Sequence, residues 1–383
     1  MNYILVDTNK KNFHPLTFTR PVADLRVGIF KISEKWEKLL GSKVSYLTEE
    51  YLNKKFPVKY DSINVYINSK FLPTPLLIEQ IEYLKPNQKL IHGNDWVACC
   101  SESDELTVSS SFASYAADTD TILENWWDIY KFNSNEIEND IQNLELLNLS
   151  FLNDNIYVIG DESKLFLHPN SKVNGVSFNT TNGSIYVAEN AEIMEGSLIR
   201  GPFAILPGAT VKMGAKIYGG TTVGPKCKVG GEVKNSVFQG KSNKSHDGYL
   251  GNSVIGEWVN LGADTNCSNL KNTLSEVKVW NFHSKKLENT GETFLGCCIG
   301  DYSKTGINTM LNTGTTIGVN CNVFGNEVPP KFIPNFSWGC NNTNRYDIEK
   351  AIKVNQKMAD FVDEELTAND ENILRVLAKR AVF

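Results

Sequence analysis

The chain has 383 residues, 41% of them hydrophobic and 21% charged, which suits two or three ordinary domains and excludes a disordered or collagen-like protein. Its 38 basic and 44 acidic residues give a formal net charge of −6, which excludes the basic surface needed for nucleic acid or an anionic membrane. The chain has no apolar run of about eighteen residues and no charged leader. We therefore expect a cytoplasmic protein whose partners are small molecules or further copies of itself.

The first 160 residues alternate short β-branched runs with helical patterns. The strand-like runs lie at residues 3–6, 43–47 and 63–67. We expect Ser33 to cap a helix that runs through Leu40, and Thr74 with Pro75 to start a second helix. This alternation predicts a Rossmann-type α/β domain with a largely parallel sheet.

Glycine is distributed unevenly along the chain. Only four of the 28 glycines lie in the first 160 residues, and most of the others lie between residues 175 and 339. In that part, aliphatic residues recur every six positions, eight times without a slip: Val187, Ile193, Ile199, Ile205, Val211, Ile217, Val223 and Val229. A period of six predicts a parallel β-helix of hexapeptide repeats, with the aliphatic side chains inside the prism and small residues at its corners.

This repeat resembles that of the hexapeptide acyltransferase and nucleotidyltransferase families, and the resemblance implies the left-handed form of the β-helix. A purely architectural solenoid is the alternative. Pro329, Pro330 and Pro334 end the repeat, and residues 347–381 show a helical period typical of one or two amphipathic helices. We predict three units: an α/β domain at 1–160, the β-helix at 161–335 and a helical tail at 336–383.

Two segments interrupt the repeat, at residues 238–248 and 270–292. Function in a solenoid usually lies where a loop leaves the coils, and the first interruption carries His246. The eight cysteines include no C-x-x-C pair. We expect them to be reduced and mostly buried, and we expect no metal site.

The residues around His246 resemble the acetyltransferase half of the bifunctional N-acetylglucosamine-1-phosphate uridyltransferase/glucosamine-1-phosphate acetyltransferase family. The matching stretches are 232–234, 246–251 and 259–263, with Asn269 beyond them. Residues 295–308 are similar to the long, archaeal-type sugar-1-phosphate nucleotidyltransferases that share this domain. Leu270 and Asp264 stand where the family has tyrosine and glycine.

The resemblance implies acetyl transfer from acetyl-CoA to an amino-sugar phosphate or sugar nucleotide by a homotrimer. His246 would be the general base, because attack on a thioester needs an unprotonated amine. Asn269 would help to stabilise the oxyanion. The implied contacts are Lys234 and Tyr249 with the sugar phosphate, Asn260 with the sugar, and Ala263 with Asn269 near the acyl donor.

The histidines allow a second interpretation, because hexapeptide trimers include zinc-dependent carbonic anhydrases. That chemistry requires a close pair of histidines. His246 and His283 lack such a spacing, and His14, His92 and His168 lie elsewhere in the chain. We therefore prefer the acyltransferase interpretation.

The N-terminal domain resembles divergent sugar nucleotidyltransferase domains that are fused to hexapeptide repeats. The segment after its first strand, residues 8–21, contains no glycine, although a triphosphate-binding loop normally depends on glycine. Arg20 and Arg26 are the phosphate-binding candidates in this comparison. Asn68 stands at the position of a magnesium-binding aspartate, and an amide binds Mg²⁺ more weakly than a carboxylate does.

Three functions therefore compete: an acyltransferase with a divergent nucleotidyltransferase domain, a nucleotidyltransferase with a structural solenoid, and a non-catalytic sugar-nucleotide-binding trimer. Mg²⁺ would be required only if the N-terminal domain is active. The sequence does not identify the sugar, the nucleobase or the acyl group.

Overall fold

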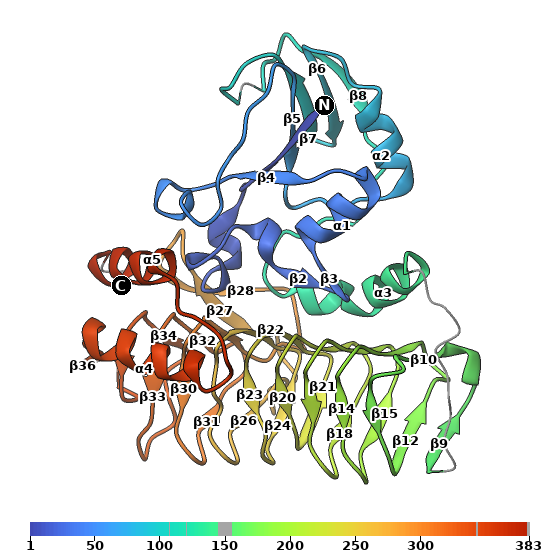
Figure 1. The fold of residues 1–383 in the computed structure, drawn as a ribbon. Coiled ribbons are helices and arrows are strands. Elements are labelled where there is room, and N and C mark those ends of the chain that lie inside the picture. Colours follow the sequence, from blue (N-terminus) through green and yellow to red (C-terminus); the bar gives the residue numbers. More distant parts are fainter. Residues whose placement is uncertain (107, 120, 145–154, 342–343, 381–383) are drawn as a thin grey trace.

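The protein consists of an N-terminal α/β domain seated on a parallel β-solenoid, with two helices at the C-terminal end (Figure 1). The structure is a computed structural model, and it describes all residues except 107, 120, 145–154, 342–343 and 381–383. The three predicted kinds of structure are confirmed in their predicted order. The hand of the solenoid and the domain boundaries stay predictions.

The N-terminal sheet has six strands in the order β4-β1-β5-β7-β6-β8. Their bounds are β1 Asn2–Val6, β4 Val44–Leu47, β5 Asn64–Asn68, β6 Gln88–His92, β7 Asp95–Ser101 and β8 Ala113–Ala116. β1 pairs in parallel with β4 and β5, but β7 runs antiparallel to both of its neighbours. The predicted strands are confirmed, and the sheet is mixed rather than largely parallel.

Three helices and a small hairpin complete the N-terminal domain. The helices are α1 Ile32–Leu40, α2 Pro75–Glu82 and α3 Asp128–Gln142, and the hairpin strands are β2 Arg26–Val27 and β3 Phe30–Lys31. Thr74 caps α2 as predicted, because its side chain accepts a hydrogen bond from the Leu77 amide. The prediction for α1 was wrong: Lys31 is the capping residue, and Ser33 lies buried in the first turn.

The solenoid has three faces. The domain face, which meets the N-terminal domain, contains β10 Leu165–Leu167, β13 Ile185–Val187, β16 Phe203–Ile205, β19 Thr221–Val223, β22 Val237–Gly240, β25 Val254–Glu257, β29 Cys298–Ile299, β32 Thr316–Ile317 and β34 Phe332–Ile333. The open face contains β9 Ile156–Ile159, β12 Val176–Asn179, β15 Leu198–Arg200, β18 Lys216–Ile217, β21 Glu232–Lys234, β24 Tyr249–Gly251, β26 Asn266–Cys267 and β31 Met310–Leu311. The third face contains β11 Lys172–Val173, β14 Glu192–Ile193, β17 Thr210–Val211, β20 Lys228–Val229 and β23 Asn243–Lys244, then β30 Lys304–Thr305, β33 Asn322–Val323, β35 Ser337–Trp338 and β36 Asn344–Arg345.

The period of six has the predicted structural cause. All eight of the periodic aliphatic residues are at most 1% exposed and belong to one hydrophobic core inside the prism. The backbone has a positive φ three residues after several of them, and Gly196 and Gly214 are two such positions. Glycine adopts this conformation without a steric penalty, which explains why glycine is concentrated in this half of the chain.

The two interruptions of the repeat differ in structure. Residues 238–248 are not an excursion: they run through β22 and β23 inside the regular coil. The second prediction is confirmed, because residues 270–292 leave the solenoid and form a hairpin of β27 Lys278–Asn281 and β28 Lys286–Asn289. His246 therefore lies on the solenoid itself rather than on a long loop.

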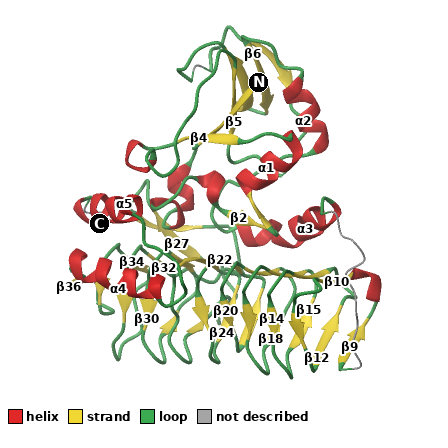
Figure 2. Ribbon diagram, viewed as in Figure 1, coloured by secondary structure: helices red, strands yellow, loops and turns green. Residues whose placement is uncertain are grey.

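Helix α3 attaches the N-terminal domain to the solenoid. Its buried Asn133 donates hydrogen bonds to the Gly220 carbonyl and to Thr222 on the solenoid, and accepts one from the Gly28 amide of the N-terminal domain. Glu138 accepts hydrogen bonds from the backbone amide and the hydroxyl of Ser184. In the described residues, helices cover the domain face and leave the open face without one (Figure 2).

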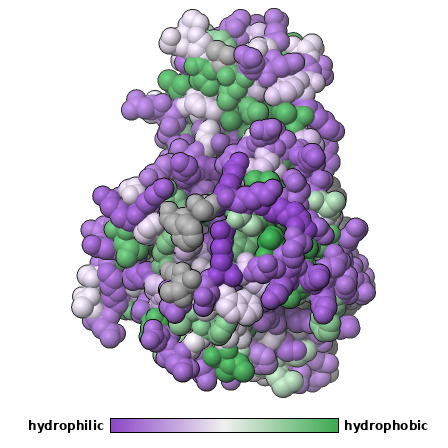
Figure 3. All heavy atoms as spheres, turned by 90° about the vertical axis from the view of Figure 1, so that its left-hand side faces the viewer, coloured by the Kyte–Doolittle hydropathy of each residue, from purple (hydrophilic) through white to green (hydrophobic). Residues whose placement is uncertain are grey.

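The predicted tail forms two helices, α4 Ile348–Asp360 and α5 Ala368–Lys379. They share a hydrophobic cluster with Phe18 and Leu52 of the N-terminal domain and with Tyr302 of the solenoid. Ion pairs extend this contact, from Lys55 to Asp370 at 2.7 Å and from Arg380 to Glu49 at 2.8 Å. Hydrophilic side chains cover most of this end of the molecule (Figure 3).

All eight cysteines are free, and all but Cys340 are buried, as expected. In the part of the chain that the structure describes, no helix is long and apolar enough to cross a membrane.

Lys244 occupies an inward position of the coil, beside Val229, and is 2% exposed. Its ammonium group donates hydrogen bonds to the carbonyls of Gly230 and His246, at 3.1 and 2.9 Å. Burial lowers the pKa of Lys244 to about 8, although Asp247 and Asp264 favour the charged form.

We predict that Lys244→Met changes the pH dependence of stability. Lys244 binds fewer protons in the folded than in the unfolded chain between pH 8 and about 10.5, so its burial becomes less unfavourable as the pH rises. The unfolding free energy of the variant relative to wild type should therefore fall across this window, by on the order of 2–3 kcal/mol. Urea unfolding at a series of pH values measures it, with the exposed neighbour Lys228→Met as control. Parallel pH profiles for wild type and Lys244→Met would contradict the prediction.

Candidate functional site

Three of the predicted site residues meet on the open face of the solenoid. β21 and β24 pair in parallel, so that Glu232 lies opposite Tyr249 and Lys234 opposite Gly251. The hydroxyl of Tyr249 and the amide of Asn269 both lie over Gly251, where a methyl group would come within 2.3 and 2.8 Å of them. Glycine at 251 therefore leaves the space in which these two polar groups approach each other.

A hydrogen bond to a neighbouring side chain fixes the side-chain amide of Asn269. Its nitrogen donates a hydrogen bond to the side-chain oxygen of Asn252 at 2.7 Å, and both residues are buried. Burial raises the pKa of Tyr249, Glu232 raises it further, and a hydrogen bond with Asn269 opposes both effects. Tyr249 is therefore a neutral hydrogen-bonding group at neutral pH. Lys234 is an exposed cation on the neighbouring strand, opposite Gly251 and so two residues along from Tyr249.

His246 lies between β23 and β24, at the corner where the third face turns into the open face. Its side chain is exposed and has no hydrogen-bond partner among the described residues, whereas its carbonyl is held by Lys244. Ala263 lies at the same corner one coil further on, because Asn243 pairs with Asn260 and the register continues from there. A ligand at this corner could contact His246 and Ala263 together.

Asn260 lies around this corner from Tyr249, on the third face. Its side-chain oxygen accepts a hydrogen bond from Asn243 at 2.7 Å. The structure therefore brings Lys234, Tyr249 and Asn269 together, places His246 and Ala263 at the adjoining corner, and separates Asn260 from the first group. Sequence reasoning missed Asn252 and Lys244. The six-residue spacing from Lys244 to Leu250 was the available signal for Lys244.

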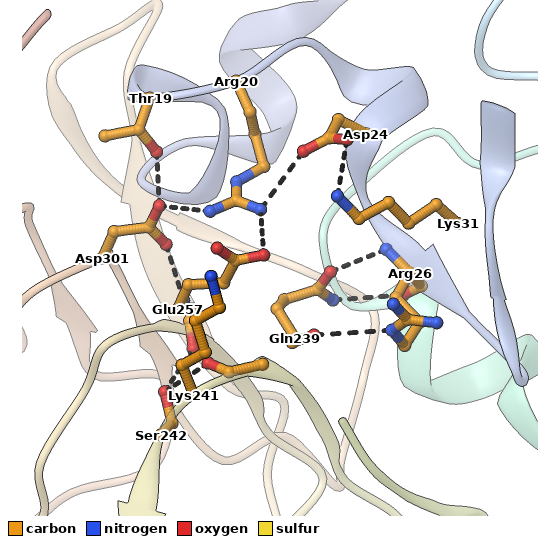
Figure 4. Close-up of polar contacts among 12 residues, drawn as sticks. Thr19, Arg20, Asp24, Arg26, Lys31, Gln239, Lys241, Ser242, Glu257 and Asp301 are labelled. Carbon is orange, nitrogen blue, oxygen red and sulfur yellow. Dashed lines mark hydrogen bonds and ion pairs between the residues drawn. The ribbon is translucent and has the colours of Figure 1, made fainter. Parts of the chain in front are cut away.

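Arg20 is buried between the N-terminal domain and the solenoid (Figure 4). It lies 2.8 Å from Glu257 and 2.5 Å from Asp301, which belong to the solenoid, and 3.3 Å from Asp24. Burial acts to lower the pKa of Arg20, but the three carboxylates raise it well above its ordinary value. Its charge is thus neutralised within the protein rather than directed at an open phosphate site.

Arg26 also lies in this junction (Figure 4). The backbone amide and carbonyl of Arg26 both bond to the side chain of Gln239, and its guanidinium group contacts the carbonyls of Gln239 and Ile29. Burial lowers the pKa of Arg26, with Glu34 acting against this effect. Both arginines therefore join the two domains, a role that the sequence comparison did not predict.

Asn68 ends β5 at the carboxyl edge of the N-terminal sheet. Its oxygen accepts hydrogen bonds from Thr8 and the Lys70 amide, and its nitrogen donates to the Trp96 carbonyl at 3.0 Å. The nearby Asp7 accepts hydrogen bonds from the Val22 amide and the Thr48 hydroxyl. These oxygens already have partners, and no group of three or more acidic, histidine or cysteine residues that could hold a metal is found among the described residues. The arrangement does not fit Mg²⁺, which prefers carboxylate oxygens.

Comparison with known families defines the class of the N-terminal domain. Residues 3–147 match the family model described as sugar nucleotidyl transferase. This part of the chain is therefore similar to sugar nucleotidyl transferases, as the sequence comparison predicted.

Curated relatives join this class to a second activity. The chain is 36% identical over 148 residues to the bifunctional sugar-1-phosphate nucleotidylyltransferase/acetyltransferase of Sulfurisphaera tokodaii, covering 38% of this chain and 36% of the relative. It is 36% identical over 121 residues to the bifunctional protein GlmU of Methanocaldococcus jannaschii, and the match covers 32% of this chain and 27% of the relative. It is 27% identical over 184 residues to GlmU of Trichormus variabilis, and the match covers 45% of this chain and 36% of the relative. The chain thus spans about a third of the length of these relatives.

We predict that Arg20→Met destabilises the protein by about 3–5 kcal/mol, because it leaves buried carboxylates without their cation. Methionine approximately preserves the apolar stem of arginine. The loss of unfolding free energy therefore reports the removed charge rather than lost packing. Urea unfolding measures the effect, with the exposed Arg200→Met on the open face as control. Equal stability of the two variants would show that the buried cluster is not stabilising.

Proposed function

We propose that the protein is a transferase whose solenoid moves an acyl group from a thioester, acetyl-CoA in the first instance, to the amine of an amino-sugar phosphate or sugar nucleotide. The observation that carries the proposal is the meeting of Lys234, Tyr249 and Asn269 on the open face, beside the corner that exposes His246. These residues supply a cation, a neutral hydroxyl, an amide and a base in one area. That is the set of groups that amine acylation of a phosphorylated sugar requires.

In this proposal His246 takes the proton that the amine loses as its nitrogen attacks the thioester carbonyl. An imidazole suits this step because its ordinary pKa lies close to neutral pH. The Lys244 ammonium group holds the carbonyl of His246 and so fixes the backbone from which the ring projects. Thiolate leaves as the amide forms, and the proton on His246 is then available to the thiolate.

Each substrate is assigned to particular residues around the corner. Lys234 and Tyr249 bind the sugar phosphate, and Asn260 binds the sugar from the third face. Ala263 and Asn269 lie next to the acyl donor, and Asn269 would stabilise the developing oxyanion by redirecting to it the amide hydrogen that it donates to Tyr249. The bond from Asn269 to Asn252 keeps that amide in one orientation.

A homotrimer is proposed because the open face and its corner with the third face expose apolar side chains on both sides of the candidate site. Met213, Ile307 and Met310 are 63%, 73% and 54% exposed in the single chain. Isolated exposed apolar residues are ordinary, but a group beside a functional corner favours burial by another copy of the chain. A neighbouring subunit would also cover the side of the site that the single chain leaves open to solvent.

For the N-terminal domain we propose sugar-nucleotide chemistry of the nucleotidyltransferase class, and a binding role without catalysis is the second candidate. The second candidate is favoured by the engaged oxygens of Asn68 and Asp7 and by the buried Arg20 and Arg26. Pyrophosphate release from a nucleoside triphosphate and a sugar 1-phosphate distinguishes the two.

We predict that His246→Ala lowers kcat/KM for acetyl transfer about 10²–10⁴-fold, because the general base is removed. Release of free thiol from acetyl-CoA across a panel of amino-sugar phosphates measures the rate. His168→Ala, at the start of the solenoid, is the matched control and should keep full activity. Unchanged thiol release by His246→Ala would exclude it as the base.

We predict that Lys234→Ala raises KM for a phosphorylated amino sugar about tenfold and changes KM for acetyl-CoA little, since a charge-assisted contact is lost on one substrate. Steady-state kinetics with each substrate varied in turn separate the two constants. An equal rise in both KM values would contradict the assignment of Lys234 to the phosphate.

A further inference from the structure

A cavity of about 270 Å³ lies at the seam between the two domains, away from the solenoid corner described above. The loop after β1 contributes Lys11 and His14 to its lining, the segment before α3 contributes Trp127, and the hairpin contributes Trp280 and Glu288. Ligand sites commonly occur at domain junctions and combine aromatic walls with a few polar groups. The cavity has this composition.

The aromatic walls are held in place before any ligand binds. Trp280 stacks on Phe332 of the solenoid, with ring centres 4.2 Å apart and planes within 2° of parallel. Phe282 meets the rings of His14 and Phe18 edge-on, at 5.2 and 5.7 Å. The hairpin is therefore anchored on both the solenoid and the N-terminal domain, and the cavity is preformed.

His14 presents a hydrogen-bond acceptor in this lining. The hydroxyl of Thr17 donates its proton to the Lys10 carbonyl at 2.8 Å, so it must accept from Nδ1 of His14, which lies 2.9 Å away. Burial lowers the pKa of His14 well below its ordinary value, and Lys10, Lys11 and His283 lower it further. The ring is thus neutral with its proton on Nδ1, and Nε2 keeps a free lone pair.

His14 is 7% exposed, and Nε2 has no hydrogen-bond partner among the residues that the structure describes. An acceptor that has no partner within the protein can accept a hydrogen bond from a ligand or a water molecule in the cavity. Lys11 lies on the same lining, is exposed, and makes no ion pair with a described residue. Asn12 joins the two walls, since its side chain bonds to the Glu124 carbonyl on one side and to His283 on the other.

We propose that this cavity binds the sugar ring of a sugar phosphate, with a ring hydroxyl donating to Nε2 of His14, the phosphate at Lys11, and the apolar side of the ring against Trp127 and Trp280. A free sugar 1-phosphate and the sugar end of a sugar nucleotide share this chemistry. The site is separate from the proposed acyl-transfer corner and does not depend on that assignment.

Isothermal titration of the full chain with glucose 1-phosphate tests the proposal, with UDP-glucose and UMP as further arms. His14→Phe keeps the ring stack on Phe18 and Phe282 and removes the acceptor, and Lys11→Ala removes the cation. Each should weaken glucose 1-phosphate binding at least about tenfold. Lys85→Ala, an exposed lysine at the far side of the N-terminal domain, is the control and should bind as wild type does.

The arms separate the outcomes. Binding of UDP-glucose that is lost in the same variants would extend the site to sugar nucleotides, and competition by UMP would replace the sugar assignment with a base-binding site. Unchanged binding in both His14→Phe and Lys11→Ala, or a loss only in Lys234→Ala, would overturn the proposal. Thiol release should stay unchanged in the two cavity variants, so failure of the acyltransferase proposal is recognised independently.

Discussion

The buried cluster around Arg20 is the constraint on which the arrangement of the whole molecule depends. One guanidinium group pairs with the carboxylates of Glu257 and Asp301 on successive coils, and Asp301 also accepts hydrogen bonds from the Thr19 hydroxyl and the Glu257 amide. Such a cluster tolerates no partial separation, because each buried charge would lose its compensation. This cluster therefore fixes the position of the N-terminal domain on the solenoid. The shape of the cavity beside the hairpin depends on that position, because both parts of the protein line it.

The same cluster explains the unusual segment after β1. A glycine-rich loop leaves its amides open toward a phosphate. This segment instead forms two short helical turns, η1 Lys10–Phe13 and η2 Leu16–Phe18, whose Phe13, Leu16 and Phe18 side chains are buried against the rest of the protein. Arg20 of this segment faces carboxylates of the solenoid, and Lys10 pairs with Asp7 and Glu49 of its own domain. Lys11 and His14 line the cavity beside the hairpin. The domain thus keeps the fold of a sugar nucleotidyl transferase while its first loop serves the junction between domains.

The solenoid could be predicted from the sequence because each inward aliphatic residue reports a repeated local environment. The roles of Arg20 could not be predicted, since its partners Glu257 and Asp301 lie 237 and 281 residues further along the chain. The error at residues 238–248 has a specific cause: Lys244 takes an inward position, so the hydrophobic period looks broken where the coil is intact. The start of α1 was missed because the Glu34 side chain accepts a hydrogen bond from the Lys31 backbone amide, an arrangement that the preference for serine does not reveal.

The N-terminal domain touches the solenoid along a continuous stretch of the domain face. The contacts run from Ser184 beside β13, through α3 at β16 and β19 and Arg26 at Gln239 in β22, to Arg20 at Glu257 and Asp301. Repeat proteins commonly gain or lose whole units during evolution, because each unit contacts only its neighbours. Here the number of coils along that stretch must match the span of the docked domain. We therefore expect duplication or deletion of a coil to be tolerated only outside that stretch. The N-terminal end of the solenoid can vary in length, whereas the C-terminal end is held because α4 and α5 also contact the N-terminal domain.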